Sequence, residues 1–198
     1  MQRTLHLVRH GKVHNPKDVI YGRLPGFKLS DLGRRQARSA AEYLAHRDVT
    51  SIWSSPLERA QETAEIIAEP HGLPVVTEER LIESGTTLEG VGRNLWAFLS
   101  SPRVLWRIRN PLGPSWGEKF SEIRGRVVEV VWEAIEKHPS GELVFVMHQT
   151  PVQAARLALA RSNRPPWLGD PCATGSVSTL TLEGDAVVSS SYFVPPQD

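Results

Sequence analysis

Two arginines and two histidines stand at or just after the ends of apolar segments that lie far apart in this chain. Arg9 and His10 follow one segment, Arg59 lies shortly after a second, and His148 ends the third. Burying Arg or His without a partner is costly, so these side chains predict a bound partner. Guanidinium groups match the oxygens of a phosphate, and a neutral imidazole is a covalent nucleophile. We therefore expect a site for a phosphate dianion, at which one imidazole attacks phosphorus and forms a phosphohistidine.

Three short apolar segments are the expected strands that position these side chains. They cover residues 4–8, 50–53 and 143–147, and a helical pattern follows each of them. Continuous apolar runs followed by helices are typical of parallel strands that are buried on both faces. In such sheets, ligands bind beyond the carboxyl ends of the strands. The spacing therefore predicts that three distant segments deliver their cations and imidazoles to one pocket.

Helix start signals follow the first two strands. Ser30 is expected to cap a helix whose apolar stripe consists of small residues and one leucine. Ser55 and Glu58 have the spacing of a capping box, with Pro56 at the first helical position. The helix N-termini after Ser55 and after His148 would add backbone N–H groups and positive dipole ends to an anion site.

The second half of the chain completes the expected fold. A long helix is predicted from about Glu118 to Lys137, and another after His148. Residues 176–182 and 186–193 flank a Glu-Gly-Asp turn and predict a hairpin or a pair of edge strands. The whole pattern predicts an α/β fold, a three-layer αβα sandwich around a mostly parallel central sheet with an antiparallel edge strand.

The composition is that of an ordinary globular protein. The chain has 198 residues, of which 40% are hydrophobic and 23% are charged, and its formal net charge is +1. The length suits a single domain over residues 1–198, and nothing in the charge calls for nucleic acid or an anionic membrane. The lone cysteine, Cys172, cannot form an intrachain disulfide, and the N-terminus lacks an apolar signal core. We expect a cytoplasmic protein.

Further short motifs follow one another along the chain around these residues. They are Arg9-His10-Gly11, Gly22, Leu29-Ser30, Gly33, Gln36-Ala37, the block from Ser55 to Ala64, Leu81-Ile82-Glu83, Glu89-Gly90, Gly117-Glu118 and Val144 to His148. In this order they resemble the histidine phosphatase superfamily, also called the phosphoglycerate-mutase-like family. The resemblance spans nearly the whole chain, and it implies the phosphoglycerate-mutase-like fold.

The resemblance also implies a role for each matching residue. His10 would be the phosphorylated nucleophile, Arg9 and Arg59 would bind the phosphoryl group, and His148 would stabilise the transition state. Glu83 would protonate the leaving group and later activate water. Three further residues would lie at the rim and bind substrate: Asn15, Gly22 and Gln149. The family uses no metal and, in its phosphatase branch, no cofactor.

Substrate and branch depend on less regular parts of the sequence. Cofactor-dependent mutases carry a much longer stretch between the acid and the second histidine than residues 84–147 here. This favours a metal-independent phosphatase, a phosphoric monoester hydrolase, over a phosphoglycerate mutase or a catalytically weak phospho-ligand-binding protein. The expected partner is a small phosphate ester, and the protein would be a monomer or a homodimer.

A cap segment and a set of evenly spaced histidines allow further interpretations of the sequence. A cap or insertion is expected at about residues 84–117, and residues 101–120 hold Trp106, Trp116 and three arginines. This segment is either a specificity lid or an amphipathic packing segment.

His6, His10 and His14 are spaced by four, which would suit a metal on a helix. Because His6 belongs to an expected strand and Gly11 interrupts, no metal site is predicted.

Overall fold

The computed structural model describes residues 2–93, 117–164 and 171–198. Within these ranges, six strands form one sheet in the order β3-β2-β4-β1-β5-β6. The strands are β1 (Gln2–Arg9), β2 (Val49–Ser54), β3 (Val75–Thr77), β4 (Glu142–Met147), β5 (Val177–Glu183) and β6 (Ala186–Phe193). The first four pair in parallel, whereas β5 and β6 run antiparallel to their neighbours.

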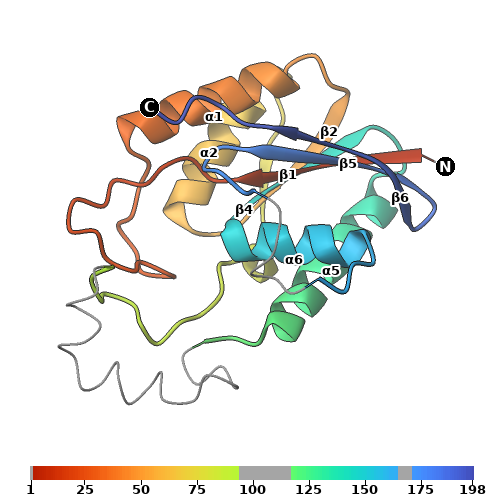
Figure 1. Cartoon of the computed structure of the whole chain (residues 1–198). Coiled ribbons are helices and arrows are strands. Elements are labelled where there is room, and N and C mark those ends of the chain that lie inside the picture. Colours follow the sequence, from red (N-terminus) through yellow and green to blue (C-terminus); the bar gives the residue numbers. More distant parts are fainter. Residues whose placement is uncertain (1, 94–116, 165–170) are drawn as a thin grey trace.

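Helices cover both faces of this sheet, as Figure 1 shows. Helices α1 (Asp31–Leu44) and α2 (Glu58–Ala68) pack on one face, and α5 (Phe120–Lys137) and α6 (Gln149–Leu159) pack on the other. Two short 3-10 helices, η1 (Glu69–His71) and η2 (Glu79–Leu81), flank β3. The predicted αβα sandwich with a mostly parallel sheet is therefore confirmed. The antiparallel edge is a strand pair, and β3, only three residues long, was not predicted.

Helix α1 begins as its sequence indicates. The Ser30 hydroxyl accepts a hydrogen bond from the backbone N–H of Gly33 at 3.1 Å, as an N-cap does. Its buried stripe contains Ala37, Ala40 and Leu44, and the last two share a hydrophobic cluster with residues of β1, β2 and α2. Small side chains on this stripe let the helix lie close to the sheet.

Helix α2 begins later than predicted. Its N-cap is Leu57, and its first helical residue is Glu58 rather than Pro56. No side chain caps this end, so the predicted capping box of Ser55 and Glu58 is wrong. Ser55 lies two residues before the N-cap, so its hydroxyl reaches only the backbone N–H of Leu57 at 3.4 Å, and it also lies 2.7 Å from Nε2 of His148.

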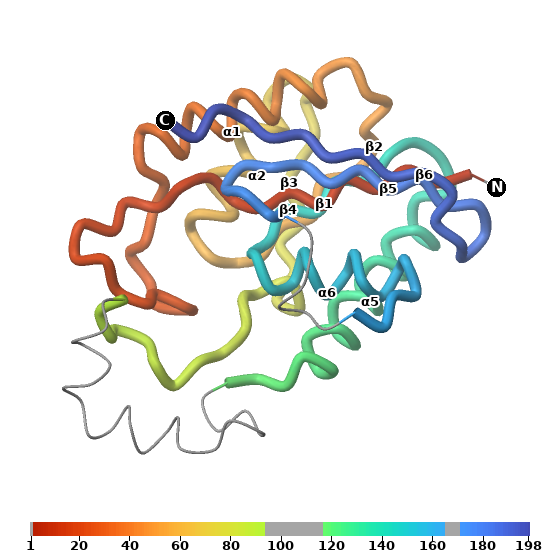
Figure 2. Tube along the Cα trace, viewed as in Figure 1, coloured from red at the N-terminus to blue at the C-terminus, as the bar shows by residue number. Residues whose placement is uncertain are grey.

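The loop that follows β1 and the loop that follows η2 lie side by side, and they meet at residues 18–20 and 91–93 (Figure 2). The backbone N–H of Ile20 donates to the carbonyl of Val91 at 2.8 Å, and Arg93 donates to Asp18 at 2.9 Å. These bonds join residues about 70 positions apart. Residues of both loops line the cleft of the candidate site.

Some sequence predictions fall partly outside the described residues. Of the expected cap at 84–117 and the segment 101–120, residues 94–116 lie outside, so the choice between lid and packing segment stays open. The long helix starts at Phe120, two residues after the predicted start at Glu118. In the described ranges, no helix is long and apolar enough to cross a membrane.

Candidate active site

The carboxyl ends of β1, β2 and β4 meet at one point. Arg9 ends β1 in register with Met147, the last residue of β4, and Ser54 at the end of β2 is in register with Val146. The backbone N–H of His10 donates to the carbonyl of Met147 at 3.0 Å. Because the next residue after Met147 is His148, the two histidines leave adjacent strands at the same level.

His10 is held in one orientation by its neighbour. The ring is 2% exposed, and its Nδ1 lies 2.7 Å from the carbonyl oxygen of Gly11. A carbonyl oxygen only accepts, so Nδ1 carries the proton and Nε2 keeps its lone pair. Burial, together with the charge of Arg59, lowers the pKa of His10 well below its usual value. The result is a neutral imidazole with one nitrogen available as a nucleophile.

A close backbone approach fixes the residue after His10. A methyl group built on Gly11 would collide with the carbonyl oxygen of Gly33, and one built on Gly33 would collide with that of Lys12. The turn after β1 therefore packs directly against the first turn of α1. Glycine at both positions allows this contact, and the contact fixes the direction in which His10 points.

His148 lies next to His10 and has one nitrogen without a partner. The ring centroids are 5.0 Å apart, and His148 is completely buried. Nε2 of His148 lies 2.7 Å from the Ser55 hydroxyl, which also accepts from the backbone N–H of Leu57 at 3.4 Å. Nδ1 of His148 is buried without a partner. Burial, then the charges of His10 and Arg59, lowers the pKa of His148.

The two arginines are likewise only partly satisfied. Arg59 is 1% exposed; its Nη2 donates to the carbonyl of Gly22 at 2.6 Å, and its guanidinium lies 4.8 Å from the centroid of the Tyr21 ring. Arg9 donates through Nη1 to the carbonyl of Cys172 at 2.5 Å. Nε of Arg9 and Nε of Arg59 are buried without partners. Burial lowers the pKa of Arg59. Such donors suit an anion that would complete their hydrogen bonds.

Several of these residues border a cleft of about 230 Å³. Of the residues that the sequence predicts for the site, Arg9, His10, Gly22, Glu83 and Gln149 line this cleft directly, whereas Arg59 and His148 are not among the lining residues. The other lining residues are Val19, Ile20, Tyr21, Ser84, Thr86 and Arg93. The cleft thus opens at the carboxyl ends of the strands, where the parallel sheet predicts a ligand.

Glu83 faces the same cleft from a loop. Its Oε1 accepts from the backbone N–H of Ser84 at 2.8 Å. Its main-chain carbonyl accepts from Nε of Arg23 at 2.7 Å. A carboxyl group thus lines the same cleft as the buried cations, which is where a leaving group would need a proton.

Asn15 makes its side-chain contacts within the loop that follows β1. Its side-chain amide donates to the carbonyl of Val19 at 2.9 Å, and its side-chain oxygen accepts from the N–H of Val19 at 3.2 Å. Asn15 is not among the cleft-lining residues. Its observed contacts close the loop that places Val19 and Ile20 in the cleft wall.

Sequence reasoning missed several residues that shape the site. Ser55 bonds His148, and the Thr63 hydroxyl accepts from the N–H of Gly11 at 3.2 Å. Both belong to the block from Ser55 to Ala64, so an unusual density of small polar residues before and within a helix was the available signal. Ile20, Thr86 and Arg93 carry no such signal.

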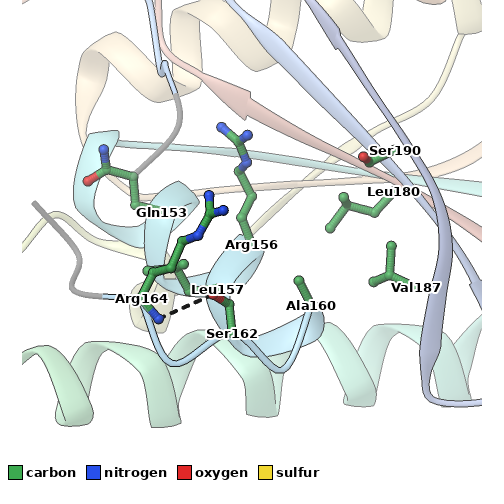
Figure 3. A pocket seen from close by; sticks show the side chains of 9 residues that line it. All are labelled: Gln153, Arg156, Leu157, Ala160, Ser162, Arg164, Leu180, Val187 and Ser190. Atoms are coloured by element: carbon green, nitrogen blue, oxygen red, sulfur yellow. Dashed lines mark hydrogen bonds between the residues drawn. The ribbon is translucent and has the colours of Figure 1, made fainter. Parts of the chain in front are cut away.

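A second cavity shows that size alone does not identify the site. About 400 Å³ lie between α6 and the β5–β6 pair, and Arg156 and Arg164 are among the lining side chains (Figure 3). This cavity is larger than the cleft, yet none of the predicted site residues lines it. Buried imidazoles with unused hydrogen-bonding capacity distinguish the cleft.

No clustered metal ligands were found in the described part of the chain. No group of three or more His, Cys, Asp or Glu side chains there is placed to hold a metal ion. His6 instead bonds Thr179 and Glu142, so the four-residue spacing of His6, His10 and His14 does not gather their rings around one point.

Comparisons with known proteins identify the family. The model of the histidine phosphatase superfamily (branch 1) matches residues 5–194. An uncharacterised Mycobacterium tuberculosis protein, Rv0525, is 44% identical over 98% of this chain and 97% of its own length. A 2,3-bisphosphoglycerate-dependent phosphoglycerate mutase of Thermoplasma acidophilum is 35% identical over 75% of this chain and 72% of its own length.

A solved structure agrees with this assignment. The native structure of mycobacterial glucosyl-3-phosphoglycerate phosphatase Rv2419c matches with a TM-score of 0.77 and 29% identity, covering 98% of each chain. The ordered motifs, the αβα fold and the paired histidines at the strand ends agree with the family match over nearly the whole chain. The chain belongs to the histidine phosphatase superfamily, branch 1.

Proposed function

We propose that this protein is a metal-independent phosphatase that hydrolyses a small phosphomonoester through a phosphohistidine on His10. The single observation that carries the proposal is the state of His10. Its Nδ1 proton is bonded to the Gly11 carbonyl, so Nε2 has a free lone pair at the carboxyl ends of the strands. Arg9, Arg59 and His148 each keep a buried nitrogen without a partner, the His148 ring lies 5.0 Å from that of His10, and such donors suit a phosphoryl group.

The reaction follows from this arrangement in two steps. In the first, Nε2 of His10 attacks phosphorus, the P–O bond to the leaving group breaks, and Glu83 gives its proton to the departing oxygen. In the second, Glu83 takes a proton from water, the water oxygen attacks phosphorus, and the P–N bond breaks. Inorganic phosphate leaves, and His10 is again neutral.

The remaining side chains stabilise charge during both steps. Arg9 and Arg59 have planar guanidinium forks that suit phosphoryl oxygens. With a proton on Nδ1, which is buried without a partner, His148 is a further donor for the charge that develops in the transition state. Gln149, the first residue of α6, lies in the cleft wall, where the helix N-terminus favours an anion.

The test measures phosphate release and the covalent intermediate together. Protein purified with EDTA is given p-nitrophenyl phosphate and a panel of natural phosphomonoesters, with vanadate as a transition-state mimic. We expect release that survives EDTA, is blocked by vanadate and is lost in His10→Ala, with an acid-labile phosphoenzyme trapped only in the wild type. Turnover that persists in His10→Ala would rule out the phosphohistidine mechanism.

The mutase is the second candidate because a relative bears that name. It predicts interconversion of phosphoglycerates that depends on a bisphosphoglycerate and greatly exceeds phosphate release. The same preparation distinguishes the two enzymes when phosphoglycerate and bisphosphoglycerate are added together. A protein that binds phosphate esters but turns over none would support the binding-protein alternative.

A further inference from the structure

One charged cluster contacts the loop that carries Glu83 and does not belong to the phosphate site. Glu118, the second residue of the Gly117-Glu118 pair, lies two residues before α5 and is 18% exposed. Its Oε2 accepts from Nη2 of Arg23 at 2.8 Å, and its Oε1 accepts from Nε of Arg126 at 2.9 Å. A second bond from Arg126, Nη2 to Oε2 at 3.1 Å, completes a bidentate fork.

Both arginines also reach the loop that carries Glu83. Nε of Arg23 donates to the Glu83 carbonyl at 2.7 Å, and Nη2 of Arg126 approaches the same oxygen at 3.5 Å. The backbone of Glu118 adds a bond of 3.0 Å from its N–H to the carbonyl of Gly85. Glu118 therefore connects α5, the 20–23 loop and the main chain around Glu83.

The local structure shows why such a connection matters. Glu83 lies outside the helices and strands, two residues after the end of η2, so no regular hydrogen-bond pattern fixes its backbone. A catalytic group loses rate steeply when it is misplaced by about 1 Å. The pair of arginines on one carbonyl oxygen is the direct restraint on the main chain at Glu83.

The carboxylate of Glu118 makes this arrangement possible. Two guanidinium groups near one carbonyl would repel each other, and the negative charge between them offsets that repulsion. Burial opposes ionisation of Glu118, but hydrogen bonds and charge from Arg126, with the charge of Arg23, keep the pKa of this carboxyl below its usual value. Glu118 is therefore charged at neutral pH, and a neutral amide there would weaken the cluster.

We infer that Glu118, acting through Arg23 and Arg126, is a positioning residue that holds the Glu83 carboxyl against the leaving group. The inference rests on the proposed function, in which Glu83 is the general acid. Glu118 itself touches neither substrate nor phosphoryl group in this scheme. Its loss should therefore affect proton transfer and leave phosphate binding largely intact.

The leaving group provides the diagnostic measurement. Phenyl phosphate releases a basic oxygen that needs a proton, whereas 2,4-dinitrophenyl phosphate releases a weakly basic one that does not. We expect Glu118→Gln to lower kcat for phenyl phosphate by about 10-fold to 100-fold. For the dinitrophenyl ester, kcat should change by less than about 3-fold, because the remaining machinery is unchanged.

Two further variants separate this inference from the proposed function. Glu83→Gln should show the same selective loss, and a uniform or absent effect there contradicts the acid role itself. If Glu83→Gln is selective but Glu118→Gln lowers both esters equally or neither, the positioning role is wrong. The matched control is Glu122→Gln, a carboxylate four residues along the chain with a 57% exposed side chain, which should change neither ester.

A milder variant covers the case in which Glu118→Gln does not fold. Arg23→Met keeps the fork between Glu118 and Arg126 and removes the 2.7 Å bond to the Glu83 carbonyl. It should give a selective loss for phenyl phosphate of roughly 10-fold. Equal rates for Arg23→Met and the wild type on phenyl phosphate, or an equal loss on both esters, overturn the inference.

Discussion

Two buried histidines, one in β1 and one just past its end, lie four residues apart and have opposite hydrogen-bonding states. His6, in mid-strand, is fully satisfied: Nε2 donates to Glu142 at 2.6 Å and Nδ1 lies 2.9 Å from the Thr179 hydroxyl. His10, just past the strand end, has Nδ1 bonded to Gly11, and its Nε2 has no partner among the recorded hydrogen bonds. The same residue type therefore has a structural role at one point of the chain and a candidate chemical role at the other.

The difference extends beyond the two rings. Six buried side-chain nitrogens or oxygens lack a partner in the described part of the chain, and three of them belong to Arg9, Arg59 and His148. Folding normally pairs such atoms because an unpaired one costs about 1–3 kcal/mol. Their concentration in the segments that follow β1, β2 and β4 indicates that a ligand, rather than the protein, completes this part of the interior.

The largest expected effect comes from replacing either histidine, His10 or His6, with glutamine. His10→Gln should lower kcat by at least about 10³-fold, because an amide cannot accept a phosphoryl group as imidazole does. His6→Gln should change kcat by less than about 3-fold when it is assayed well below its melting temperature. Comparable losses of kcat in the two variants would contradict a chemical role for His10 and a structural role for His6.

A smaller loss is expected where charge is kept and geometry is changed. Arg59→Lys preserves the positive charge but replaces a planar fork with a point charge, and it leaves the Gly22 carbonyl without its present donor. We expect kcat/KM to fall by about 10²-fold. Arg34→Lys is the matched control, because that arginine is 40% exposed and pairs with Asp31 and Glu62. Wild-type kcat/KM in Arg59→Lys would show that charge alone suffices.

The residues at the strand ends could be predicted from sequence because two signals agree there. Apolar runs define the strands, and the polar residues that end them have no other reason to be buried. Arg9, His10 and His148 follow from this rule, and the parallel topology then brings their segments together. Arg59 follows from its place in the block that begins at Ser55, at the first turn of α2.

The wall of the cleft could not be predicted in the same way. Val19 and Ile20 line it because Asn15 closes a loop and because that loop pairs with residues 91–93. These contacts join segments about 70 residues apart and show no periodicity in either segment. Ser55 was misassigned as a helix cap because α2 begins two residues later than its sequence indicates, and its bond to His148 joins residues 93 positions apart.

The third prediction concerns the free energy of unfolding and tests His6, whose two ring nitrogens both have hydrogen-bond partners. His6→Ala removes the buried partner of Thr179 and Glu142, and we expect the free energy of unfolding to fall by about 1–3 kcal/mol. Urea titration followed by circular dichroism measures this change. An isolated His10→Ala substitution should cost less, since Nε2 of that ring has no protein partner to lose. A larger loss in His10→Ala than in His6→Ala would contradict the comparison.

The smallest expected effect is the pH dependence of stability, and its sign follows from the buried rings. Burial lowers the pKa values of His6, His10 and His148 below the ordinary value of 6.5, which the unfolded chain keeps. Below pH 6.5 the unfolded state therefore binds more protons than the folded state, so the free energy of unfolding falls as the solution becomes more acidic. Above that pH the contribution is fully present.

The same argument predicts which histidine pKa values a bound phosphate analogue raises. Vanadate or phosphate in the cleft adds negative charge beside His10 and His148, which favours their protonated forms and raises their pKa values. His6 is already paired with Glu142 and lies earlier in β1, so its contribution should persist. Urea midpoints between pH 5 and pH 8, with and without vanadate, should therefore show a shallower acid slope with the ligand in the wild type. In His10→Gln the ligand effect should shrink, whereas in His6→Gln it should remain.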